Sequence, residues 1–292
     1  MTATPERTRV PAQPSAVDSA VDSAVDTVTL ASRSGRRHGR VPRWLIKTIS
    51  PIVLIVLWQV LSSTGVLDDD TLASPVTVVQ TAVGMWEDGS LQSAVGTSVL
   101  RVLAGLAFGV VAAVVLATVA GLFRRGEDAI DAPMQMLRTV PVIGLIPLLI
   151  IWFGIGETPK IVLVGLAVTF PLYINLFAGI RNVDSGLIEA SRTLGLGWFG
   201  QVRHVILPSA MPNFLTGLRY SLGTAWLALV FGETINATSG IGYEMNKARE
   251  FFATDIIVVC LALYAILGLV TDMIVRALER GLLSWRPAFS GQ

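Results

Sequence analysis

The chain has 292 residues, of which 52% are apolar and only 15% are charged, and its formal net charge is +1. Soluble domains carry about 25% charged residues, so this composition argues against an ordinary soluble domain and favours a protein that lies in a bilayer. The nearly neutral net charge gives no reason to expect a nucleic-acid partner.

The first 42 residues differ from the rest of the chain. They contain a four-residue repeat, SAVDSAVDSAVD (residues 15–26), surrounded by Pro, Thr, Ser and Arg. Too little apolar side chain is present to form a packed core, so we expect a disordered tail over residues 1–42. A short surface helix is the alternative, although Val, Ser and Asp are poor helix formers. No apolar region of a secretory signal follows the first methionine.

Apolar runs of about 20 residues, the length that crosses a bilayer, recur six times in the remainder of the chain. The third run is interrupted by Pro133, Pro141 and Pro147, which predict kinks or a broken helix. We therefore expect a transmembrane domain over residues 43–286 and a short tail over 287–292. The predicted spans are residues 44–63, 95–123, 130–153, 160–180, 213–235 and 254–277.

The basic residues predict the orientation of these spans. Residues 65–94, between the first and second spans, contain no Lys or Arg but five carboxylates. Every second connection is basic, and basic connections face the cytoplasm. Both termini are therefore expected in the cytoplasm; the connection with Lys247 and Arg249 departs from this pattern but also carries two glutamates. The basic residues on the cytoplasmic side are Arg33, Arg36, Arg37, Arg40, Arg43, Arg124, Arg125, Arg181, Arg192, Arg203, Arg280 and Arg286.

Some spans carry small or charged residues that indicate close packing or function. Gly105 and Gly109 form a small-xxx-small pair, which lets two helix backbones approach closely. Charges inside a membrane are costly and point to function by default, but an arginine near a helix end can also reach the interface or form a structural pair. The charges in or near spans are Arg101, Arg138, Arg219 and Glu233, and Cys260 is expected to be a small buried hydrophobe.

A polar insert, residues 184–208, separates the fourth and fifth spans on the side predicted to be cytoplasmic. Asp184 is a candidate helix cap, Gly195 a candidate helix end, and Pro208 is expected to close a second short helix. Both short helices have an apolar face, which could meet the lipid interface, the protein's own spans or a groove on a partner. The two faces consist of Leu187, Ile188, Ser191 and Leu194, and of Trp198, Phe199, Val202, Val205 and Ile206.

The same insert carries a family resemblance. Glu189-Ala190-Ser191, then Gly195, then Ile206-Leu207-Pro208 resembles the EAA signature of ABC importer permeases, with Ser191 in place of the second alanine. The segments 137–161, 170–195 and 216–255 resemble the sulfonate, taurine and nitrate branch of that family. The resemblance begins near residue 45 and continues to the C-terminus. It implies an all-α polytopic membrane protein with six transmembrane helices, a type I importer fold and a cytoplasmic coupling helix, in the bacterial inner membrane.

The resemblance also implies partners. The chain has no G-x-x-x-x-G-K-[ST] loop to hold ATP phosphates, so we expect no enzymatic activity and no cofactor or metal in this chain. Two copies of a separate ATPase would bind ATP and Mg²⁺, a second permease copy would complete a homodimer, and an extracytoplasmic protein would deliver the solute. The residues expected to couple to the ATPase are Glu189, Ala190, Ser191, Leu194, Gly195, Leu196, Trp198, Phe199, Val202 and Pro208.

The translocation path and the substrate are less constrained by the sequence. Polar or amphipathic residues inside the fourth and fifth spans are path candidates, with packing and local helix hydrogen bonds as the alternative. The expected solute is an aliphatic sulfonate or taurine; nitrate, bicarbonate and a thiamine-precursor pyrimidine are alternatives within the family. An ATP-independent transporter and a membrane enzyme remain other classes, although neither repeated halves nor a catalytic cluster is found. The path candidates are Asn175, Thr224, Trp226, Glu233 and Thr234.

Overall fold

The computed structural model describes residues 43–68 and 71–283, so the predicted tails over 1–42 and 287–292 lie outside the described residues. The chain divides into two compact units, residues 1–56 and 57–292. The described part contains helices and turns and no strand. Its helical elements are α2 (Arg43–Ser63), α3 (Pro75–Glu87), α4 (Ser90–Leu122), α5 (Arg124–Leu137), η1 (Val142–Leu145), α6 (Ile146–Phe153), α7 (Glu157–Arg181), α8 (Ser185–Thr193), α9 (Trp198–Gln201), η2 (Val202–Ile206), α10 (Leu207–Asn236), α11 (Ile241–Glu250) and α12 (Thr254–Leu282).

Four helical segments of the described chain are long and apolar enough to cross a bilayer: residues 90–122, 157–181, 198–235 and 254–282. They coincide with the second, fourth, fifth and sixth predicted spans. A fifth candidate span consists of α5 followed by residues 142–153, which are bent by 90° relative to α5. Residues 49–63 of α2 form a shorter apolar helix, and the count of six spans stays a prediction.

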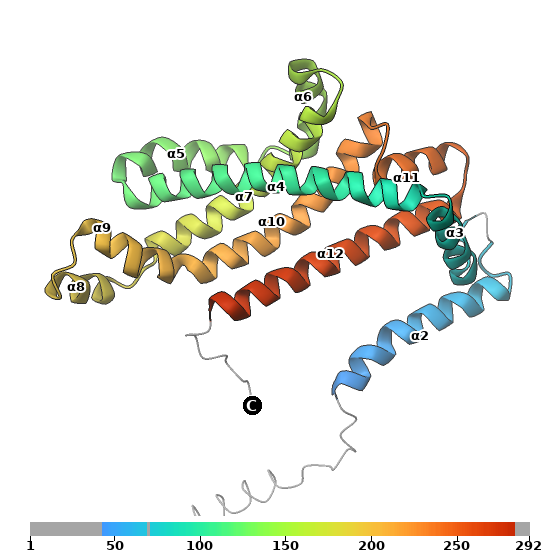
Figure 1. The fold of residues 1–292 in the computed structure, drawn as a ribbon, viewed down its shortest axis with the longest axis horizontal. Helices are drawn as coiled ribbons and strands as arrows, with labels where there is room; N and C mark the ends of the chain where they lie inside the picture. The colour runs from blue at the N-terminus through green and yellow to red at the C-terminus, as the bar shows by residue number, and fades with distance from the viewer. Residues whose placement is uncertain (1–42, 69–70, 284–292) are drawn as a thin grey trace, which may run out of the picture. The chain divides into compact units, whose positions relative to one another are not determined.

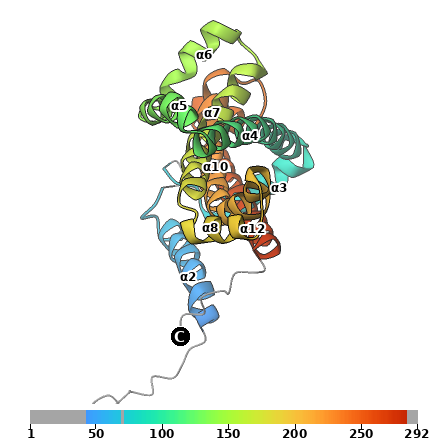
Figure 2. The same ribbon diagram turned by 90° about the vertical axis from the view of Figure 1, so that its left-hand side faces the viewer.

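The second unit is a helical bundle in which α7 lies between α4 and α10 (Figures 1 and 2). Small residues allow the close approach of α4 and α7. A Cβ atom added to Gly109 would lie 2.5 Å from the carbonyl oxygen of Gly165, and one added to Gly105 would lie 2.5 Å from the Val164 side chain. Thr169 crosses the same contact, since its hydroxyl donates to the carbonyls of Gly165 and Gly109. The predicted small-xxx-small pair therefore faces another helix.

Hydroxyl groups and small residues also join α10 to α7. Ser221 donates to the backbone carbonyl of Val168 at 2.9 Å, and Thr224 donates to that of Ala167 at the same distance. Gly217 allows the approach, because a Cβ atom there would lie 2.9 Å from the Asn175 side chain. The three helices α4, α7 and α10 thus form the rigid centre of this unit.

The third predicted span is broken where its prolines indicated. α5 ends at Leu137, the short 3-10 helix η1 begins after Pro141, and α6 begins at Ile146 with Pro147 in its first turn. A proline is tolerated in the first turn of a helix because its missing N–H would have no partner there. Pro133, in contrast, lies inside α5 without ending it. Figure 1 shows α6 projecting away from α4 and α7.

Two connections that the charge pattern marked as loops contain helices. Residues 65–94 include α3, which is capped by the Ser74 side chain at the Thr77 N–H and begins with Pro75. The connection before α12 includes α11, which begins after Gly240. Both short helices lie at the end of the bundle opposite α8 and α9 (Figure 1). These positions lack an apolar run long enough to span a membrane, and for that reason the sequence predicts loops there. A short helix does not need such a run.

The contact between α4 and α7 generates the first prediction. Replacing Gly109 with Ala places a methyl group against the Gly165 carbonyl, and overpacking of this kind costs about 1–3 kcal/mol. Gly96 is a matched control in the same helix, since nothing lies within 4 Å of its Cβ position. We expect G109A, but not G96A, to lower the unfolding temperature of the purified protein in detergent. Equal melting temperatures would contradict the packing described above.

Candidate functional site

The insert between α7 and α10 reverses the chain at one end of the bundle (Figure 1). Asp184 caps α8, because its carboxylate accepts a hydrogen bond from the Gly186 N–H at 2.8 Å. α8 ends at a glycine with a left-handed backbone, Gly195, whose φ is +82°. The N–H groups of Gly195 and Leu196 donate to the carbonyls of the last helical turn, at 2.9 and 3.0 Å. The predicted cap and the predicted glycine turn are both confirmed.

The second half of the insert differs from the prediction. Pro208 does not close a short helix: α9, the π-helical turn η2 and α10 follow one another, so that residues 198–235 form one segment of 38 residues. Pro208 lies in the first turn of α10, directly after the π-helical turn. A π-helical turn bonds residue i to i+5 instead of i+4, and this local change of register accommodates the missing proline N–H. The insert is therefore continuous with a membrane-spanning helix.

The signature residues of the insert lie around this reversal. Glu189, Ala190 and Gly195 are exposed, whereas Ser191 is buried and donates to the Ile188 carbonyl at 2.7 Å. The residue that departs from the signature, Ser191, is thus the one that packs inward. Pro208 is half-buried.

The large apolar residues of the insert divide into two groups. Val202 is buried and Leu196 half-buried, so these two side chains pack inward. Trp198 is exposed but its ring lies 5.7 Å from that of Phe123, at the turn between α4 and α5. Leu207, at the start of α10, is 39% exposed. Three residues are more exposed and lack such a ring contact, and we call them the apolar tip: Leu187, Leu194 (81% exposed) and Phe199 (69% exposed).

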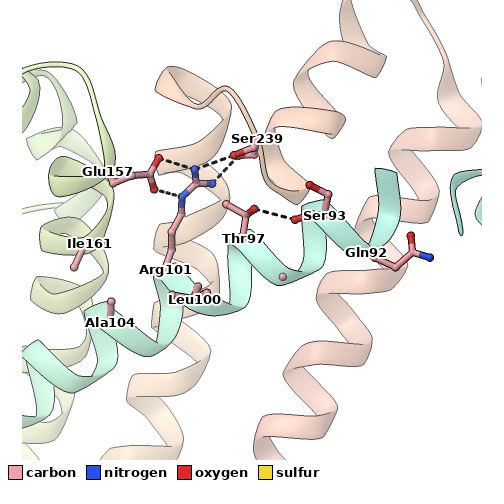
Figure 3. A pocket seen from close by; sticks show the side chains of 10 residues that line it. Gln92, Ser93, Thr97, Leu100, Arg101, Ala104, Glu157, Ile161 and Ser239 are labelled. Atoms are coloured by element: carbon pink, nitrogen blue, oxygen red, sulfur yellow. Dashed lines mark hydrogen bonds and ion pairs between the residues drawn. The ribbon is translucent and has the colours of Figure 1, made fainter. Parts of the chain in front are cut away.

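A charged cluster joins α4, α7 and α10, and Figure 3 shows one side of it, with Arg101 beside Glu157 and Ser239. Arg101 on α4 is 3% exposed, and its guanidinium donates to the carboxylates of Glu157 on α7 and Glu233 on α10. It also donates to the backbone carbonyl of Ser239 at 2.6 Å. Lys160 adds a second cation, 3.0 Å from Glu157. We call these four side chains, Arg101, Glu157, Lys160 and Glu233, the Arg101 cluster.

Glu233 is the most enclosed member of the cluster, with 1% of its surface exposed. Its carboxylate accepts from Arg101 at 2.7 Å, from the Ser98 hydroxyl at 2.8 and 2.9 Å, and from the Gly242 N–H at 2.8 Å. The Tyr264 hydroxyl on α12 completes the set at 3.3 Å. A buried carboxylate requires such partners because its desolvation is otherwise uncompensated. The cluster thus ties α4, α7, α10, α11 and α12 together.

The sequence marked Arg101 and Glu233 as intramembrane charges but did not pair them, since 132 residues separate them. Glu157 was missed because it stands in the short connection GIGET, at the first residue of α7. Its side chain is 54% exposed and borders a cavity of about 590 Å³ that is lined by α4, the start of α7 and Ser239. The polar residues that line this cavity are Gln92, Ser93, Thr97, Arg101, Glu157 and Ser239 (Figure 3).

Comparison with known proteins decides what this arrangement is. Residues 105–284 match the family described as "Binding-protein-dependent transport system inner membrane component". The chain belongs to this family. It is 41% identical over 248 residues to the putative aliphatic sulfonates transport permease protein SsuC of Bacillus subtilis, covering 85% of this chain and 90% of that protein. It is 44% identical over 252 residues to the corresponding Escherichia coli protein, covering 85% and 96%. The taurine transport system permease protein TauC of Escherichia coli is 33% identical over 238 residues, covering 80% and 86%.

Solved structures with the same fold come from ABC importers. A chain of an amino acid ABC transporter determined with histidines aligns with a TM-score of 0.58 and 16% identity, covering 68% of this chain and 97% of that one. A chain of the inward-facing MetNI methionine ABC transporter aligns with a TM-score of 0.53 and 20% identity, covering 64% and 94%. The permease therefore has the type I ABC importer fold. It is a multi-pass inner-membrane subunit, not an enzyme, and its family works with an ATPase and a binding protein.

The candidates for the translocation path are placed mainly in helix contacts. Asn175 donates to the Pro171 carbonyl at 2.8 Å, Thr234 bonds carbonyls of its own helix, and Trp226 is buried with its ring against Tyr264. Glu233 belongs to the Arg101 cluster. Thr224 differs from these four, because it also lines a cavity of about 260 Å³. These contacts agree with the alternative of packing and local hydrogen bonds, and the path assignment stays a prediction.

The described residues contain no group of three or more His, Cys, Asp or Glu that could hold a metal ion. Cys260 is 1% exposed, in the environment expected for a small hydrophobe. The binding of ATP and Mg²⁺ by a partner subunit stays a prediction.

The Arg101 cluster generates the second prediction. Replacing Arg101 with Met leaves the Glu233 carboxylate buried without its counter-charge, and breaking a buried pair in this way costs about 3–5 kcal/mol. Arg219 is a matched control: it also pairs with two carboxylates, Asp272 and Glu279, but all three side chains are about one-third exposed. R219M should therefore cost about 1 kcal/mol or less. Unfolding of the two purified variants in detergent, followed by circular dichroism, measures the loss of unfolding free energy in each. An equal loss in R101M and R219M would show that the buried ion pair stabilises the protein no more than the exposed one.

Proposed function

We propose that this permease forms the membrane pathway of an ATP-driven importer for aliphatic sulfonates, with taurine as a related solute. One observation carries this proposal: the chain is 41% and 44% identical, over 85% of its length, to two permeases named for aliphatic sulfonates, from Bacillus subtilis and Escherichia coli. The lower identity to the taurine permease, 33%, supports taurine as the second candidate. Taurine is itself a short sulfonate, so one headgroup chemistry covers both.

The proposed assembly contains two copies of this permease, two ATPase copies that bind ATP and Mg²⁺, and an extracytoplasmic solute-binding protein. The apolar tip suits the contact with the ATPase, because its three large apolar side chains are all exposed in the chain's polar insert. α6 suits the contact between permease copies, since it projects from its own bundle with Ile151 and Trp152 exposed. In this assembly the insert faces the cytoplasm, as do both termini.

The continuity of residues 198–235 supports a mechanical role for the insert. A helical segment of 38 residues spans about 57 Å at 1.5 Å per residue. It starts at the insert and reaches Glu233 in the Arg101 cluster at the other end of the bundle. Movement of the ATPases against the apolar tip would thus reach the far end through one helix. Such a helix moves as a body, which is how alternating access is commonly coupled.

Transport measurements test the proposed function directly. The permease, its ATPase and its solute-binding protein are reconstituted in proteoliposomes, and uptake of labelled ethanesulfonate, taurine and nitrate is followed with and without ATP. We expect ATP-dependent uptake of ethanesulfonate, weaker uptake of taurine, and none when the binding protein is omitted. Uptake of nitrate without either sulfonate would overturn the assignment of the solute, and uptake independent of ATP would overturn the importer mechanism.

The turn at Gly195 generates a prediction about coupling. Replacing Gly195 with Val forces a β-branched residue into a left-handed backbone, at about 1–2 kcal/mol, and distorts the reversal that presents the apolar tip. Gly197 is a matched control two residues away: its φ is −68°, and nothing lies within 4 Å of its Cβ position.

We expect G195V to reduce both sulfonate uptake and co-purification with the ATPase, while membrane insertion is retained and G197V behaves as wild type. Replacing the exposed Glu189 with Lys should reduce uptake in the same way, because it reverses the charge at the signature position. Full activity in both G195V and the Glu189→Lys variant would remove the insert from the coupling mechanism.

A further inference from the structure

A second cavity lies beside the break between α5 and η1. Its volume is about 260 Å³, slightly below the range of about 300–1,000 Å³ that is common for small-molecule pockets. It therefore suits a small solute. The break, α7 and α10 supply its lining residues: Arg138, Pro141, Val142, Ile143, Ala167, Phe170, Pro171, Thr224, Leu227 and Ala228.

Arg138 is the one cation among these lining residues, and it lacks the carboxylate partner that several arginines at helix contacts have. Arg101, Arg181 and Arg219 each form an ion pair with a carboxylate. Within the described part of the chain no carboxylate lies within 4 Å of Arg138, although the residue is ordered at the C-terminal end of α5. An unpaired guanidinium at a cavity is available for an anionic ligand, and its planar donors match the oxygens of such a group.

The remaining wall of the cavity is apolar. Phe170 and Leu227, from α7 and α10, lie on one side, and Val142 and Ile143 belong to the broken span. Broken helices at membrane depth are tolerated where the irregular backbone lines a cavity, and in secondary transporters, a different class, such breaks lie at the solute site. One cation beside apolar walls matches a ligand with an anionic head and an alkyl chain.

We propose that this cavity is a binding site for the transported alkanesulfonate, with Arg138 at the sulfonate group and the alkyl chain against Phe170 and Leu227. The assignment rests on the proposed function, since the sulfonate is the anion that the importer carries. Thr224, which the sequence already placed on the path, lines the same cavity, although its hydroxyl donates to backbone carbonyls of α7 and α10. The bilayer offers a competing amphiphilic anion, an anionic phospholipid, which the test below must separate from the solute.

Equilibrium binding of labelled hexanesulfonate measures the site. The permease–ATPase complex is held in phosphatidylcholine nanodiscs, without ATP or binding protein, so that only the membrane site contributes. We expect R138Q to weaken binding by about tenfold to a hundredfold, because it removes hydrogen bonds between charged groups, and R138K to restore part of it. Arg280 is the control: it is an exposed arginine without a carboxylate within 4 Å among the described residues, and R280Q should bind as wild type.

Chain length tests the apolar wall in the same assay. Hexanesulfonate should bind more tightly than ethanesulfonate, by about fourfold for each methylene group that the cavity encloses. Replacing Leu227 with Ala should reduce this gain while leaving the binding of ethanesulfonate nearly unchanged. A chain-length preference that is the same in both proteins would contradict contact with Leu227.

Three results would overturn the site: no saturable binding to the wild type, equal binding by R138Q and wild type, or equal loss in R138Q and R280Q. A fourth is that phosphatidylglycerol in the nanodiscs abolishes binding to the wild type, which would assign the cavity to a lipid headgroup.

Uptake by the complete wild-type importer separates this inference from the proposed function. If the wild type imports no sulfonate, the proposed function fails; if it imports sulfonate and R138Q binds and imports equally well, only the site fails.

Discussion

A hydrocarbon environment offers no hydrogen bonds, so each polar group in this bundle needs a partner within the protein. The Arg101 cluster is the strongest result of this constraint. It brings together residues from α4, α7 and α10 and receives further bonds from α11 and α12. The hydroxyl groups of Ser221 and Thr224, which bond carbonyls of α7, satisfy the same requirement at the centre of the bundle.

The two ends of the bundle differ in chemistry, and one helix joins them. At one end the chain reverses at Gly195 and leaves Leu194 and Phe199 exposed; at the other end the Glu233 carboxylate accepts hydrogen bonds from four groups of the protein. Residues 198–235 connect the two ends without a break. An exposed apolar end suits a contact with another subunit. A buried ionic end suits a contact that holds the helices of one subunit together while they move as one body.

Much of this organisation could be predicted from local sequence. The positions of long apolar runs, the cap at Asp184, the glycine turn at Gly195 and the break near Pro141 all depend on the residues at those positions and their immediate neighbours. The signature around Glu189 placed the chain in its family, and the comparisons with known permeases agree. Pro208 was misjudged because a π-helical turn, which short-range propensity does not reveal, lets the helix pass through it.

The sequence by itself determined the fold class, the family and the location of the insert, because hydrophobic periodicity and turn chemistry act over a few residues. Only the tertiary structure decided that Arg101 pairs with Glu157 and Glu233, and that Arg138 stands without a carboxylate beside a cavity. These facts depend on which helices pack together, and residues 132 positions apart come into contact through the packing of whole helices. Whether a given arginine forms an ion pair is therefore a property of the packed bundle, and no short stretch of the chain encodes it.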